Sequence, residues 1–146
     1  MTPRAFLLER ALPPLYWVML AAALWILLRG HNEPGGGFIA GLVAVSATSV
    51  LAIVVDPGTA RRRLPLAPVP LAAAGVGLAL LSGLPAVLLG RPYLTHLWAT
   101  IPLGLMELRV STVLAFDLGV LLAVWGTLSG YVLALLPGGP PGDPAP

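Results

Sequence analysis

Cysteine and lysine are both absent from this chain. The lack of cysteine excludes disulfide bonds, thiolate metal sites and cysteine nucleophiles, but it does not indicate a compartment. The lack of lysine excludes proton relays that depend on an ammonium group whose pKa falls on burial. The positive charge is therefore carried by eight arginines, against six acidic residues.

Charge of either sign is also scarce. Only 10% of the 146 residues are charged, whereas a soluble domain has about a quarter. Hydrophobic residues make up 58% of the chain, and the mean hydropathy is +0.92. Such a chain cannot cover a water-facing surface with charge, so the composition predicts a protein embedded in membrane lipid. The arginines lie between apolar segments, which favours contacts with lipid headgroups and gives no indication of nucleic-acid binding.

Four apolar stretches are long enough to cross a bilayer: residues 12–28, 37–55, 66–89 and 113–136. At about 1.5 Å per residue, roughly 20 helical residues span a hydrocarbon core of about 30 Å. We predict an all-α integral membrane protein in which residues 1–136 form a single four-helix transmembrane domain. Residues 137–146, half of them proline, are predicted to be a disordered tail. The first stretch resembles a signal peptide, but no small-residue cleavage site follows it and three more spans do.

The arginines predict the orientation of these spans. With four spans, both termini and the loop at residues 56–65 lie on one side of the membrane. That side holds five arginines, the other three: Arg4, Arg10, Arg61, Arg62 and Arg63 against Arg29, Arg91 and Arg109. Cytoplasmic loops carry the excess of positive charge. We therefore predict a multi-pass protein of the cell (inner) membrane with both termini in the cytoplasm.

The segment between the third and fourth spans, residues 91–112, is of mixed character. It carries charged and aromatic side chains among aliphatic ones: Tyr93, His96, Trp98, Glu107 and Arg109. It is too polar for a span and too apolar for a free loop, so we predict an interfacial segment lying on the membrane or against a partner. Two histidines without cysteine form no recognisable metal site. Phosphate loops, nucleophile elbows and haem motifs are also missing from the sequence, so we expect no cofactor, no metal and no enzymatic activity.

A polar turn joins the first two spans. His31, Asn32 and Glu33 precede Pro34 and three glycines, Gly35, Gly36 and Gly37. Glycine permits positive φ, proline suits the start of a helix, and the exposed amides there attract anions. The turn is either a structural or docking element, capped by Glu33 or holding a carboxylate of a partner helix, or a part of an ion pathway.

Asp117 is the one carboxylate inside a predicted span. Carboxylates within a membrane are costly and often belong to proton or cation routes. However, the fourth helix is expected to begin near Ser111 or Thr112, either of which is a good N-cap. Asp117 would then lie one or two turns from the interface, where the helix dipole and Arg109 stabilise it. Structural or inter-subunit anchoring and ion handling both remain open.

Small residues form a stripe on two of the spans. Gly37 and Gly41 share a face of the second span, and Gly119, Gly126 and Gly130 share a face of the fourth. Such stripes let helix backbones approach closely, so we predict helix-packing surfaces, within the chain or to a neighbour. At about 100° per residue, Asp117 lies nearly opposite the glycine face of its helix.

Two stretches together resemble a known family. Residues 30–43, Gly-His-Asn-Glu-Pro-Gly-Gly-Gly-Phe-Ile-Ala-Gly-Leu-Val, are similar to the signature that opens the second helix of the B subunit of Mrp-type multisubunit sodium/proton antiporters, the MnhB family. Residues 111–120, followed by Val124 and Gly126, resemble the family's second signature at the start of the last helix. Val113 stands where the family pattern has proline, and residues 56–92 carry nothing diagnostic.

This resemblance implies an accessory membrane subunit of a Na⁺/H⁺ antiporter complex, with other antiporter subunits and membrane lipid as its partners. In that family the principal proton-carrying lysines and glutamates lie on large subunits related to respiratory complex I. The chain would contribute to assembly and to an inter-subunit route for Na⁺ and H⁺. Related subunits also occur in membrane-bound hydrogenases, so a membrane-arm subunit of a redox-driven pump is the alternative. A purely structural scaffold is the third possibility.

Overall fold

The computed structural model of the chain describes residues 3–29, 36–95, 97–102 and 107–137. Within these ranges the chain forms six helices and two strands: α1 (Pro3–Arg29), α2 (Gly37–Val54), α3 (Pro57–Arg63), α4 (Pro68–Leu81), α5 (Leu84–Leu88), β1 (Trp98–Pro102), β2 (Glu107–Ser111) and α6 (Thr112–Leu135). Four segments of this part are long and apolar enough to cross a membrane: Arg10–Arg29, Gly37–Val54, Pro57–Leu88 and Thr112–Leu135. The predicted membrane fold class is confirmed. The predicted disordered tail lies, from residue 138 onward, outside the described residues.

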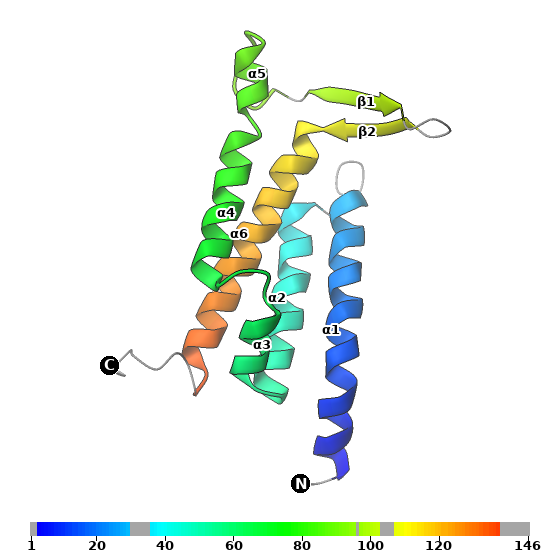
Figure 1. Ribbon diagram of the computed structural model, residues 1–146, viewed down its shortest axis with the longest axis vertical. Coiled ribbons are helices and arrows are strands. Elements are labelled where there is room, and N and C mark those ends of the chain that lie inside the picture. Colours follow the sequence, from blue (N-terminus) through cyan, green and yellow to red (C-terminus); the bar gives the residue numbers. More distant parts are fainter. Residues whose placement is uncertain (1–2, 30–35, 96, 103–106, 138–146) are drawn as a thin grey trace.

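The long helices run side by side, and α6 holds the bundle together (Figure 1). It packs extensively against both α2 and α4, while α1 packs mainly against α2. The start of α1, the end of α6 and α3 lie at one end of the molecule. The start of α2, α5 and the two strands lie at the opposite end.

The third spanning segment is not the single continuous helix that the sequence predicts for residues 66–89. It breaks after α4, at Ser82 and Gly83, and resumes as the short α5. Pro85 has no amide hydrogen, so the backbone ladder cannot continue through the break. Tyr93 stabilises it: the phenol donates a hydrogen bond to the Leu80 carbonyl oxygen at 2.5 Å, and the ring occupies the space where a side chain on Gly83 would lie.

The short helix α3 is fixed against α1. The Asp56 carboxylate accepts a hydrogen bond from the Thr59 amide at 2.9 Å and caps the helix. At the other end, the Arg63 guanidinium donates to the Pro13 carbonyl oxygen at 3.3 Å and lies 5.7 Å from the centre of the Tyr16 ring. The Tyr16 hydroxyl donates in return to the Arg63 carbonyl oxygen at 3.2 Å. These contacts tie the loop between the second and third spans to the first helix.

Part of the predicted interfacial segment forms a β-hairpin, which the sequence reasoning did not predict. β1 pairs antiparallel with β2, with Trp98 opposite Ser111 and Pro102 opposite Glu107. The strands are rich in β-branched and aromatic residues, which favour extended structure. Thr112 fixes the base of the hairpin, since its amide donates to the Leu97 carbonyl oxygen at 3.1 Å and its hydroxyl accepts from the Leu97 amide at 3.2 Å.

Helices α2 and α6 share one buried side-chain hydrogen bond. Trp125 Nε1 donates to Thr48 Oγ1 at 2.9 Å, and that hydroxyl donates to the Ala44 carbonyl oxygen at 3.0 Å. Ser129, one turn after Trp125, is fully buried, and its hydroxyl oxygen has no hydrogen-bond partner among the described residues. The rest of the core cluster consists of leucines and alanines, together with Tyr16.

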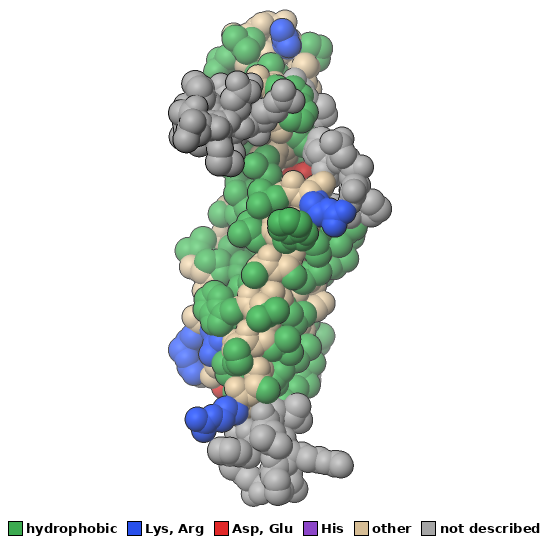
Figure 2. Space-filling view, turned by 90° about the vertical axis from the view of Figure 1, so that its right-hand side faces the viewer, with side chains coloured by type: hydrophobic (Ala, Val, Ile, Leu, Met, Phe, Trp, Pro, Cys, Tyr) green, Lys and Arg blue, Asp and Glu red, His purple; other side chains and the backbone are tan. Residues whose placement is uncertain are grey.

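Hydrophobic side chains cover the middle of the molecule on the face that Figure 2 shows, and arginines lie toward its two ends. Many large apolar side chains are exposed, among them Trp17, Trp25 and Leu135. Soluble monomers rarely expose a continuous apolar surface of this kind. The surface therefore suits a surrounding of lipid and other membrane helices.

Candidate functional site

The polar turn ends in a glycine pair that places the start of α2 directly on α6. Gly36 is the N-cap residue and has a φ of 89°, a left-handed conformation that favours glycine. Gly37 follows as the first helical residue, and a side chain there would overlap the Asp117 carbonyl oxygen. Gly36 therefore allows the turn, and Gly37 allows the two backbones to meet.

Asp117 lies in the second turn of α6. The helix begins after Ser111, whose hydroxyl accepts a hydrogen bond from the Leu114 amide at 3.4 Å. Asp117 lies five positions after Thr112, which corresponds to about 8 Å along the helix. Asp117 is half-buried and has at least one polar or electrostatic contact. Because its backbone meets Gly37, Asp117 belongs to the junction where α2 begins.

The structure brings together the two motifs that carried the family resemblance. Gly37, in the middle of the first motif, touches Asp117, in the second. The positive end of the α2 dipole therefore lies beside a carboxylate-bearing turn of α6. The remaining residues of the predicted turn lie outside the described residues: His31, Asn32, Glu33, Pro34 and Gly35.

The glycine stripes face different neighbours. Gly41 of α2 lies against α6, where an added side-chain carbon would be 2.9 Å from Val124 Cβ. Gly119 and Gly126 of α6 lie against α4 instead: at Gly119 the added carbon would be 2.6 Å from the Ala79 amide nitrogen, and at Gly126 it would overlap the Ala72 amide nitrogen. Gly130 approaches Pro68 at the start of α4. Helix α6 therefore presents a glycine face to α4 and a different face, with Asp117, to α2.

Among the described residues, the junction offers the carboxylate of Asp117 and the amides at the start of α2. Such a carboxylate can accept hydrogen bonds, exchange a proton or pair with a cation. In the described part of the chain, no group of three His, Cys, Asp or Glu residues could hold a metal ion. The side chains of Glu107 and Arg109 and the whole of His96 lie outside the described residues.

Sequence reasoning missed two features of the structure. It did not assign the Trp125–Thr48 hydrogen bond, although an indole N–H within a span needs an acceptor. It also treated the three arginines of the 56–65 loop as one topology signal, whereas Arg63 binds α1 and Arg61 lines a groove. The spacing of the sequence gives no sign of this division.

The family model described as "Domain related to MnhB subunit of Na+/H+ antiporter" matches residues 7–130. The chain belongs to the MnhB family. A relative from Bacillus subtilis, named as the B subunit of a Na(+)/H(+) antiporter, is 36% identical over 121 residues, which cover 82% of this chain and 85% of the relative. Its namesake from Alkalihalophilus pseudofirmus is 32% identical over 120 residues, covering 82% and 83%.

A solved structure shares the fold of this MnhB chain. The structure of the Mrp complex from Dietzia sp. DQ12-45-1b contains a chain that matches with a TM-score of 0.77 and 29% sequence identity. The match covers 97% of the present chain but only 15% of the solved one. The same fold therefore occurs there as a segment of a much longer polypeptide.

Proposed function

We propose that this chain works as an accessory integral-membrane subunit of a multisubunit Na⁺/H⁺ antiporter. The observation that carries this function is the MnhB match over residues 7–130, joined by relatives of similar length that are named as antiporter B subunits. The likeness to a chain of an Mrp complex adds a multisubunit setting with other antiporter subunits as partners. These relatives favour the antiporter over the redox-driven pump that the sequence left open.

Purification of the complex tests this function. The full chain is extracted from its native membrane in a mild detergent, and the proteins that accompany it are identified by mass spectrometry. Large multi-spanning antiporter-like subunits are expected, without iron–sulfur or nickel proteins. Recovery of hydrogenase-like subunits would move the chain to a redox-driven complex, and recovery of the chain alone would contradict a subunit role.

We further propose that the junction of Gly37 and Asp117 lies on, or anchors, an inter-subunit ion route. Its support is the backbone contact between Gly37, the first residue of α2, and Asp117, a half-buried acidic residue of α6. In this proposal His31, Asn32 and Glu33 are the further candidates for the ion route or for inter-subunit contact, and Pro34 and Gly35 belong to the turn that precedes α2. With Asp117 as the one carboxylate within a span and no lysine in the chain, this subunit supplies only part of an ion route.

Charge-neutral substitutions test the junction. Asp117→Asn and Glu33→Gln keep side-chain volume and remove the titrating group. We expect each complex to assemble and to show slower Na⁺-dependent proton movement in everted vesicles. Asp56→Asn, at the opposite end of the molecule, is the control and should transport normally. Full transport by both junction variants would exclude an ion role, whereas failure to assemble would assign the junction to subunit docking.

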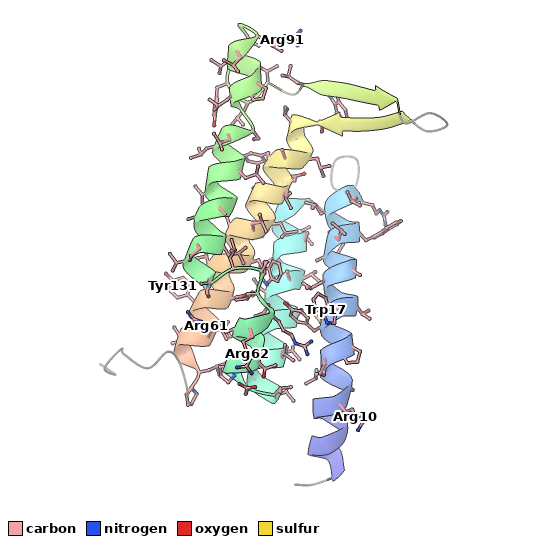
Figure 3. All side chains as sticks on the ribbon, viewed as in Figure 1. Arg10, Trp17, Arg61, Arg62, Arg91 and Tyr131 are labelled. Atoms are coloured by element: carbon pink, nitrogen blue, oxygen red, sulfur yellow. The ribbon has the colours of Figure 1, made fainter. Side chains whose placement is uncertain are left out.

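We also propose that both termini face the cytoplasm. In its support, Arg10, Arg61 and Arg62 lie at the end of the molecule that holds α3, and Arg91 lies at the opposite end (Figure 3). Because the chain has no cysteine, Arg62→Cys and Arg91→Cys each introduce a unique thiol at an exposed position. A membrane-impermeant maleimide should label Arg91→Cys in intact cells, and Arg62→Cys only in everted vesicles. The reverse pattern would contradict this orientation.

A further inference from the structure

A groove lies on the outer surface where α3, the start of α4 and the end of α6 meet. Its volume is about 580 Å³, within the range of roughly 300–1,000 Å³ typical of small-molecule sites. One wall comes from Pro68, Val69 and Ala72 of α4, and the other from α6. The lining is mostly apolar, and the groove opens at the surface of two membrane-spanning helices.

Small residues on α6 make the groove. Gly126, Gly130 and Ala134 stand in it on successive turns, and the two helix backbones meet at Gly126 because no side chain separates them there. The stretch from Gly126 to Ala134 measures about 12 Å along the helix.

A cationic and a phenolic side chain stand at the groove. Arg61 and Tyr131 both line it, and both are exposed. They lie near one another beside the lower half of α6 in Figure 3. This end of the groove is where the third span begins, so both side chains lie near the level of the lipid headgroups.

Of the three consecutive arginines, only Arg61 has no side-chain partner within the described part of the chain. Arg63 donates to the Pro13 carbonyl oxygen, and Arg62 donates to Thr59 Oγ1 at 3.0 Å. The Arg61 guanidinium makes no hydrogen bond or ion pair with the described residues. The nearby carboxylate, Asp56, accepts hydrogen bonds from Thr59 and interacts electrostatically with Arg62. A free positive charge therefore faces the mouth of an apolar groove.

We propose that this groove is a binding site for one anionic phospholipid. An acyl chain lies between α4 and α6, and the headgroup phosphate pairs with Arg61 beside the Tyr131 hydroxyl. Basic pockets between transmembrane helices attract acidic headgroups, especially on the cytoplasmic side. The mostly apolar lining suits hydrocarbon, and the single guanidinium of Arg61 at the groove supplies the charge that complements the phosphate. This site is separate from the junction of Gly37 and Asp117.

Native mass spectrometry of the detergent-extracted protein, full chain with its accompanying subunits, tests the site. Phosphatidylglycerol and phosphatidylcholine with identical acyl chains are titrated separately. One arginine near a headgroup should make phosphatidylglycerol bind about fivefold more tightly. Arg61→Gln should abolish this preference, and Arg91→Gln, at the far end of the molecule, should keep it. Equal binding of the two lipids, or a preference that survives Arg61→Gln, would overturn the proposal.

A second pair of variants tests the groove itself. Ala134→Trp fills part of the groove and should weaken the binding of both lipids at least severalfold. Leu135→Trp changes the neighbouring exposed residue, which lies outside the groove, and should leave binding unchanged. Inorganic phosphate at the same concentrations should not displace the lipid. Displacement by phosphate, or no effect of Ala134→Trp, would reduce the site to a surface anion contact and contradict an acyl-chain site.

The occupant in the assembled complex can be identified directly. Thr127 lines the groove, and Thr127→Cys introduces a single thiol because the chain has no cysteine. A benzophenone maleimide attached there is irradiated in native membranes, and the products on this chain are analysed by mass. Phospholipid adducts are expected. A crosslink to a peptide of another subunit would instead assign the groove to a protein partner, and neither result depends on whether the complex is an antiporter.

Discussion

Three consecutive arginines have three different surroundings at the residue scale. Arg63 is half-buried and holds α3 against α1 through the Pro13 carbonyl and the Tyr16 ring. Arg62 contacts Thr59 on the surface of its own short helix. Arg61 faces the groove between α4 and α6. Identical residues next to one another in sequence therefore serve anchoring, local helix stability and, in our proposal, lipid binding.

Thr48→Val should destabilise the protein. Valine keeps the shape of threonine but removes the acceptor of the Trp125 indole hydrogen, which is buried between α2 and α6. Interhelical hydrogen bonds in membranes contribute about 0.6 kcal/mol on average and up to about 1.7 kcal/mol. The free energy of unfolding in mixed micelles measures the loss. Ser46→Ala is the control, because Ser46 is exposed and bonds only to its own helix, at Leu42; an equal loss in both variants would contradict the role of the Trp125 contact.

Ser129→Ala should have the opposite effect on the free energy of unfolding. The Ser129 hydroxyl is fully buried without a hydrogen-bond partner among the described residues, and an unsatisfied buried polar group costs about 1–3 kcal/mol. Removing it should leave stability unchanged or raise it by about 1 kcal/mol. The same unfolding measurement compares this variant with the wild type. A loss above about 1 kcal/mol would show that this hydroxyl has a partner.

At the scale of elements, close backbone contact explains how α4 and α6 associate. Gly75 of α4 lies against the backbone of Ala123 in α6, and Gly119 of α6 lies against the backbone of Ala79 in α4. Membrane helices gain no hydrophobic free energy from leaving lipid, so close packing of small residues must hold them. The glycines of this pair therefore carry the packing that bulky side chains provide in soluble proteins.

Gly126→Ala should separate these two helices. The added methyl would overlap the Ala72 amide nitrogen, and overpacking of this kind costs about 1–3 kcal/mol. Gly77→Ala is the matched control, since a side chain there meets nothing within 4 Å and alanine favours a helix by about 0.8–1.0 kcal/mol. Thermal midpoints in detergent should fall for the first variant and hold or rise for the second. A fall in both would point to a general effect of glycine replacement.

The cap of α3 should make stability depend on pH. Hydrogen bonds from the Thr59 side chain, and then from its amide, lower the pKa of Asp56 below its ordinary value of 3.8. Because the pKa of Asp56 is lower in the folded state, the ionised cap stabilises the folded protein fully above pH 3.8, the ordinary pKa. This stabilisation is lost as the pH falls from there through the lower pKa of the folded state. Asp56→Asn caps without titrating. Between pH 6 and pH 3 the wild type should therefore lose more stability than Asp56→Asn, and parallel curves would contradict this.

Hydropathy located the spanning elements well and the remaining elements poorly. The predicted spans 37–55 and 113–136 agree with α2 and α6 within one residue at either end, because the contrast between apolar and polar residues is sharp there. The break at Gly83 and the hairpin were not predicted. Both depend on contacts between separate segments, Tyr93 with Leu80 and β1 with β2, which a local pattern does not contain.

The candidate site was predicted in parts. The sequence singled out Gly37 and Asp117 separately, the first for backbone freedom and the second for its carboxylate. It did not show that they touch, because their contact depends on how α2 packs against α6. The family resemblance, by contrast, needed only the two motifs and is confirmed by the match over residues 7–130.

On the scale of the whole molecule, the bundle is a thin sheet of helices with much apolar surface left uncovered. Trp17 and Trp25 of α1 point outward, 59% and 64% exposed. Helix α1 contacts mainly α2, and α4 contacts mainly α6. The two outer helices therefore offer large surfaces to lipid and to neighbouring subunits, which agrees with a chain that works inside a larger assembly.

Hydrogen exchange in detergent should follow this arrangement. Amides in the middle of α6 should exchange most slowly, because α6 packs against both α2 and α4. Amides in the first turns of α1 should exchange earliest among the spanning helices, since local opening follows contact density. Mass spectrometry of proteolytic fragments after timed labelling gives the order. Equal protection of α1 and α6 would show that the bundle opens only as a unit.

The central place of α6 also has a consequence for biosynthesis. Of the described helices it is the last to leave the ribosome, yet α4 packs chiefly on it. Some 54 residues separate the end of α4 from the end of α6, which at about 5–20 residues per second is a delay of roughly 3 to 11 seconds. During that interval the face of α4 that carries Gly75 lacks its partner helix. The insertion machinery, lipid or a chaperone must cover it until translation reaches the final span.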